Sequence, residues 1–89
     1  MTRAMMNAKR RKPRYVISPM NLSREQWARA ACEAFAARAG QDFEVEPQEV
    51  VGDLLADLMH LCAQRKIDFE KMLENGRSHF EIERTGKDD

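Results

Sequence analysis

The stretch that decides the fold is GDLLADLMHLC, residues 52–62. It sets two aspartates, a histidine and a cysteine among leucines, and such side chains bind metals and move protons. When residues 49–64 are wound at about 100° per residue, the apolar side chains fill roughly half of the circumference. Asp57 and His60 fall on the opposite polar strip, and Cys62 lies about 160° from His60. The pattern therefore predicts an amphipathic helix and not a metal or catalytic site.

The predicted helix should run from Pro47 to about Gln64 or Arg65, because proline suits the first turn of a helix. Its apolar arc is wider than one neighbouring helix usually covers. Either two other helices flank it, or part of it is a dimer surface. The candidate interaction face consists of Val51, Leu55 and Met59, with Trp27 from the preceding helix.

Two further helices are predicted, one on each side. Ser23 and Gln26 have the spacing of a capping box, which predicts a helix over residues 24–39. Gly40 then supplies a left-handed end. Asp68 is a good N-cap for the last helix. The inner face of that helix carries Phe69, Met72, Leu73, Gly76 and Phe80.

These elements predict an all-α domain of three helices, in which the first helix lies across an antiparallel hairpin of the other two. We expect a flexible basic arm over residues 1–14, one helical domain over residues 15–84 and a fraying tail over residues 85–89. Residues 15–18 and 43–46 are short β-prone runs. They could pair as a minor ribbon, although an isolated two-stranded ribbon is barely stable.

Charge is divided unevenly along the chain. Residues 1–14 hold six basic residues and no acid, whereas residues 15–89 hold nine bases and fifteen acids. Such asymmetry indicates contact with nucleic acid or with an acidic surface, although a short basic terminus is often simply solvated. The candidate phosphate contacts are Lys9, Arg10, Arg11, Lys12 and Arg14.

Composition excludes several classes of protein. No run of about 18 apolar residues is present, so we expect no membrane span, and no apolar core follows the first charges, so we expect no secretory signal. Two cysteines make no disulfide framework and favour a reducing cytoplasm. Both cysteines lie on apolar helical faces without a base nearby, so no nucleophilic enzyme is expected. No cofactor or metal is implied within one chain, although a dimer could bring symmetry-related histidines together.

Three segments carry a resemblance, namely residues 53–60 (DLLADLMH), 67–69 (IDF) and 79–83 (HFEIE). Over residues 49–84 the chain resembles small uncharacterised helical proteins of bacterial mobile elements. The resemblance implies a bacterial cytoplasmic setting and an accessory role, and it implies no site residue.

The sequence thus favours a non-enzymatic protein-interaction or regulatory module that forms a homodimer. The alternative is a nucleic-acid-associated protein that binds DNA non-specifically through its basic arm. Direct reading of DNA by the last helix is disfavoured, because its exposed face carries three acids against two bases.

Overall fold

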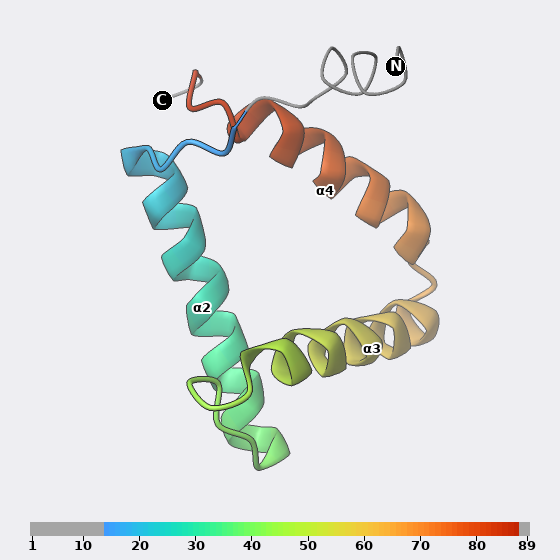
Figure 1. Cartoon of the computed structure of the whole chain (residues 1–89). Coiled ribbons are helices and arrows are strands. Elements are labelled where there is room, and N and C mark those ends of the chain that lie inside the picture. Colours follow the sequence, from blue (N-terminus) through green and yellow to red (C-terminus); the bar gives the residue numbers. More distant parts are fainter. Residues whose placement is uncertain (1–13, 88–89) are drawn as a thin grey trace, which may run out of the picture.

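The computed structural model describes residues 14–87, which form three α-helices. They are α2 (Pro19–Ala39), α3 (Pro47–Arg65) and α4 (Phe69–Glu83). The helices form the three sides of an open triangle, which we call the frame (Figure 1). The N-terminal part of α3 crosses the C-terminal part of α2, and α4 returns from the far end of α3 to the start of α2 (Figure 1). The predicted all-α, three-helix architecture is confirmed, with the α3–α4 hairpin opened wide.

The first helix begins one and a half turns earlier than predicted. Ser18 is its N-cap, and the hydroxyl oxygen accepts a hydrogen bond from the backbone N–H of Asn21 at 3.1 Å. Pro19 occupies the first turn, where its missing N–H costs nothing and its fixed φ suits a helix. The predicted cap at Ser23 is therefore wrong, because that serine lies inside α2.

The other predicted helix ends are confirmed. Gly40 ends α2 in the left-handed conformation, with φ 73°, and its N–H donates to the carbonyl of Ala36. Pro47 lies in the first turn of α3. Lys66 ends that helix at φ 60°, a conformation that non-glycine residues adopt at a cost. The side chain of Asp68 caps α4 by accepting from the N–H of Lys71 at 3.1 Å.

Neither β-prone run forms a strand within residues 14–87. Residues 43–45 form a turn instead, because the side chain and carbonyl of Asp42 accept hydrogen bonds from Glu44, Val45 and Glu46. The other run lies extended along the C-terminal end of α4, where the N–H of Val16 donates to the carbonyl of Arg84 at 2.8 Å.

This contact belongs to a latch that closes the frame, formed by residues 15–18, Asn21 and residues 80–86. Asn21 is 3% exposed, and its side-chain NH₂ donates to the carbonyls of Val16 at 2.8 Å and Glu83 at 2.9 Å. One amide group therefore joins the start of α2 to the end of α4, across 62 positions of sequence.

Apolar contacts complete the latch. The ring of Tyr15 stacks on that of Phe80 with 6.0 Å between centroids. Gly86 adopts φ 74° directly against Val16, whose side chain would lie 3.1 Å from a Cβ at position 86. Residues 85–87, expected to fray, thus begin with a turn packed on the segment that precedes α2.

The core of the frame is very small. Within residues 14–87, the buried apolar residues are Ala36 on α2 and Val50 on α3. Ala36 lies in the last turn of α2 and Val50 in the first turn of α3. In α4, which the structure describes completely, no residue is buried. The chain therefore forms three helices while burying very few of their apolar side chains.

Candidate interaction surface

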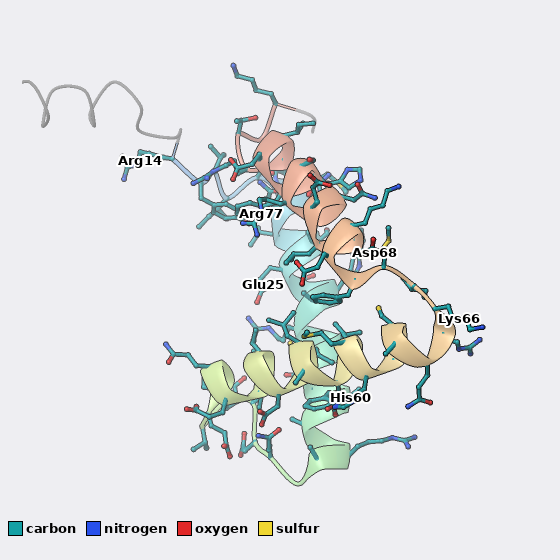
Figure 2. All side chains as sticks on the ribbon, turned by 90° about the vertical axis from the view of Figure 1, so that its right-hand side faces the viewer. Arg14, Glu25, His60, Lys66, Asp68 and Arg77 are labelled. Carbon is teal, nitrogen blue, oxygen red and sulfur yellow. The ribbon has the colours of Figure 1, made fainter. Side chains whose placement is uncertain are left out.

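The apolar and polar side chains of α3 lie on opposite sides of the helix. His60 lies on the side of α3 that points away from α4 (Figure 2). At about 100° per residue, Val51, Leu55 and Leu58 lie on the side opposite His60, so they face the side on which α4 lies. They remain 44%, 44% and 37% exposed, so α4 does not cover them.

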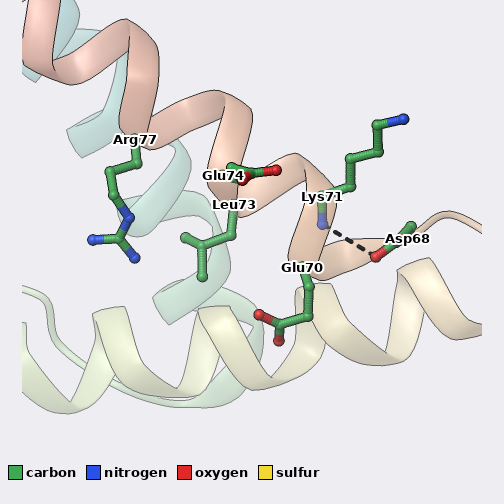
Figure 3. Close-up of a pocket in the computed structure, with 6 residues that line it drawn as sticks. All are labelled: Asp68, Glu70, Lys71, Leu73, Glu74 and Arg77. Atoms are coloured by element: carbon green, nitrogen blue, oxygen red, sulfur yellow. Dashed lines mark hydrogen bonds between the residues drawn. The ribbon is translucent and has the colours of Figure 1, made fainter.

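The corresponding stripe of α4 is also uncovered. Figure 3 shows that Leu73 projects from α4 toward α3, while the side chain of Lys71 extends the other way. Leu73, Met72 and Phe80 are each between 40% and 46% exposed. The depression drawn in Figure 3 is lined by Asp68 and side chains of α4, with Leu73 as its apolar member. The depression is open to solvent and does not enclose a binding site.

We define the open apolar surface as Val51, Leu55 and Leu58 of α3 with Met72, Leu73 and Phe80 of α4. The sequence had placed Val51 and Leu55 in an interaction face, and the structure leaves both of them exposed. It did not list Leu58 there, although Leu58 follows Leu55 by three residues on the same apolar arc. The sequence predicts an inner face for Met72, Leu73 and Phe80, whereas the open hairpin leaves them 40–46% exposed.

Of the other two predicted members of the interaction face, Met59 stays beside Leu55 and Trp27 lies apart. Met59 is 49% exposed and follows Leu55 by four residues, one turn along the same side of α3. Trp27 is 64% exposed, but it precedes Ala36, near which α3 crosses α2, by nine residues, or about 14 Å along the helix. The structure therefore does not gather Trp27 with the α3 residues into one patch.

The amount of uncovered apolar surface is large for so short a chain. Seventeen large hydrophobic side chains within residues 14–87 are exposed, most of them by 40–65%. Full burial of such a side chain contributes about 1.5–3 kcal/mol, so half-exposure of seventeen forgoes on the order of 15 kcal/mol. More than half of the surface of any folded protein is apolar, so association could recover only part of this free energy, and association also has an entropic cost.

Charged side chains near the latch form a small network. Arg24 lies 3.6 Å from the carboxylate of Glu83 and donates to the side-chain oxygen of Asn21 at 2.7 Å. The guanidinium of Arg84 lies over the ring of Phe80, with 5.4 Å to the centroid. These groups join the end of α4 to the start of α2.

On the outer surface of α2, Arg29 pairs with Glu25 at 2.7 Å. The hydrogen bond to Glu25, followed by the charge of that carboxylate, raises the pKa of Arg29 above its ordinary value. The pair is solvent-exposed, and such pairs contribute little to stability.

The described residues offer no metal centre. No group of three or more His, Cys, Asp or Glu side chains within residues 14–87 is arranged to hold a metal ion. Cys32 and Cys62 are free thiols of intermediate exposure. Of the predicted phosphate contacts, Lys9, Arg10, Arg11 and Lys12 lie outside the described residues. Arg14 is described and exposed, and its side chain extends away from the three helices (Figure 2).

None of the helices described between residues 14 and 87 combines the length and hydrophobicity that crossing a bilayer requires. In comparisons with known proteins, no family model, no curated protein and no solved structure matches the chain. The resemblance carried by residues 49–84 therefore stays an expectation from the sequence.

Proposed function

We propose that this chain is a non-enzymatic protein-interaction module that forms a homodimer and serves an adaptor or regulatory role. The observation that carries the proposal is the contrast between one large buried apolar side chain, Val50, and seventeen exposed ones within residues 14–87. Large exposed apolar patches on small proteins mark interaction sites. A chain of 89 residues is also short enough for association to supply part of its core.

The setting proposed for this module is the bacterial cytoplasm. The resemblance of residues 49–84 to proteins of bacterial mobile elements supports the bacterial part. The two free thiols support a reducing compartment, where cysteines stay unpaired.

A charge placed on the open apolar surface tests the proposal. In an isolated chain Leu55→Glu should change little, because position 55 is 44% exposed. In a dimer it would bury a carboxylate, which is costly. His60→Glu is the matched control, since it adds the same side chain to the same helix on the opposite side. We expect the wild type and His60→Glu to sediment as dimers and Leu55→Glu as a monomer. A monomeric wild type, or a Leu55→Glu variant that stays dimeric, contradicts the proposal.

A second candidate function is non-specific DNA binding through the basic arm. It is favoured by the segregation of charge, with six bases and no acid in residues 1–14. Neutralisation of six phosphates predicts a log–log salt slope of about −5 for duplex binding. A full-length variant with glutamine at positions 9, 10, 11, 12 and 14 should lose that binding. Absence of binding by the wild type at low salt contradicts this candidate and leaves the interaction module untouched.

A further inference from the structure

Within residues 14–87, helix α4 is attached to the rest of the frame at its two ends. Residues 70–80 are all exposed, whereas Phe69 next to the link from α3 and residues 83–86 in the latch are half-buried. No residue of α4 is buried. Moving α4 as a unit therefore breaks contacts at its ends and disrupts no packed core.

The link that joins α3 to α4 is short and strained. It consists of residues 66–68, and Lys66 has φ 60°, the one positive φ of a non-glycine residue within residues 14–87. A residue with a side chain adopts this conformation at a cost in free energy. The link turns the chain so that α4 returns to the start of α2 (Figure 1). Short connecting loops under strain favour the exchange of an element between two copies, because an extended link relieves the strain and spans about 10 Å for three residues.

The contacts of the latch do not depend on the link. The N–H of Val16 donates to the carbonyl of Arg84 at 2.8 Å, and the side-chain NH₂ of Asn21 donates to the carbonyl of Glu83 at 2.9 Å. Each bond joins the segment around the start of α2 to the end of α4. When Glu83 of the partner subunit and Arg84 of the partner subunit occupy the same place, the same bonds form. An exchange of α4 between two copies therefore keeps the contacts of the latch.

We infer that the two copies of the proposed homodimer exchange their α4 helices, so that the latch of each copy is closed by α4 of the other. The surface that receives the partner consists of residues 15–18 and Asn21. The inference rests on the proposed homodimer and states how its two copies are joined. The latch contributes equally to the exchanged and unexchanged forms, so other contributions decide between them. Relief of the turn at Lys66 favours exchange, as does the proposed burial of the open apolar surface between the copies.

Two cysteines in the latch distinguish an exchanged latch from one closed within a chain. A Cβ at position 86 would lie 3.4 Å from the Cβ of Val16, close to the separation found in a disulfide. In a full-length Cys32→Ala, Cys62→Ala background, Val16→Cys with Gly86→Cys should oxidise to a covalent dimer, because the two sulfurs that meet belong to different copies. We expect about tenfold more covalent dimer on a denaturing, non-reducing gel than from Val16→Cys alone, which lacks the second sulfur. A disulfide that closes within one chain, and leaves a species of 10.3 kDa, overturns the inference.

Isotope-filtered NMR gives a second readout without any change in the latch. Labelled and unlabelled wild-type chains are unfolded together in urea and refolded, so that mixed dimers form. The rings of Tyr15 and Phe80 are stacked with 6.0 Å between centroids, so their protons lie within range of a nuclear Overhauser effect. A cross-peak between a labelled Tyr15 and an unlabelled Phe80 supports the exchange, and its absence from a mixture of dimers overturns it. A dimer whose latch closes within each chain retains the proposed function, whereas a monomeric wild type removes both.

Discussion

The latch depends on one side chain, and Asn21→Ala tests this directly. The substitution removes the NH₂ donor from the carbonyls of Val16 and Glu83, at 2.8 and 2.9 Å, and the oxygen acceptor from Arg24. Asn21 is 3% exposed, so water cannot easily replace it. A hydrogen bond contributes about 0.5–1.5 kcal/mol net, and an orphaned buried group costs about 1–3 kcal/mol. We expect the free energy of unfolding to fall by roughly 2–3 kcal/mol.

The assay is urea unfolding of the full chain at one fixed protein concentration, with hydrogen exchange of the Val16 amide as a local probe. That amide donates to the carbonyl of Arg84, so its protection reports whether the frame is closed. Asn21→Asp is a second variant that keeps the acceptor for Arg24 but loses both donors. It should destabilise at least as much as alanine, because a carboxylate would face two carbonyl oxygens. A change below about 0.5 kcal/mol in both variants, the range of ordinary surface substitutions, would refute the role assigned to Asn21.

Three further predictions concern the helix ends and the crossing of α2 and α3. Ser18→Ala removes the N-cap of α2 and should lower the free energy of unfolding by about 1 kcal/mol in urea unfolding, whereas Ser23→Ala should change it by less than about 0.5 kcal/mol. Val50→Ala removes the one large, fully buried side chain among the described residues and should lower the free energy of unfolding by about 2 kcal/mol in urea. An unchanged urea midpoint would show that α2 and α3 are not packed on each other through Val50. Lys66→Gly relieves a φ of 60° and should raise the thermal midpoint, with a gain of up to about 1 kcal/mol, and a loss of stability would contradict the left-handed end of α3.

Helix ends could be predicted where one local signal dominates. Gly40, Pro47 and Asp68 each satisfy a requirement of the backbone within a few residues, so their roles follow from sequence spacing. The start of α2 could not be predicted in this way because two capping signals compete within six residues. Ser23 offers a capping box, while Ser18 is followed by proline in the position that proline prefers. In the structure Ser18 is the cap, and Asn21 lies in the first turn of α2 with its side chain bonded to Val16 and Glu83.

The open surface was predictable only in part. Periodicity identifies which face of α3 and α4 is apolar, and these faces are where the sequence places them. Periodicity does not show which element covers an apolar face. The same sequence pattern is therefore compatible with a closed α3–α4 hairpin and with the open frame. The difference arises from contacts between distant segments, such as Asn21 with Glu83. Local sequence spacing does not predict contacts between residues so far apart in the chain.

A single chain leaves the apolar faces of α3 and α4 exposed, and we propose that a second copy covers them. Sedimentation velocity of the untagged full-length protein over a range of micromolar concentrations tests it most directly. We expect a single species of twice the chain mass of 10.3 kDa. A stable, folded species of 10.3 kDa throughout that range would contradict it.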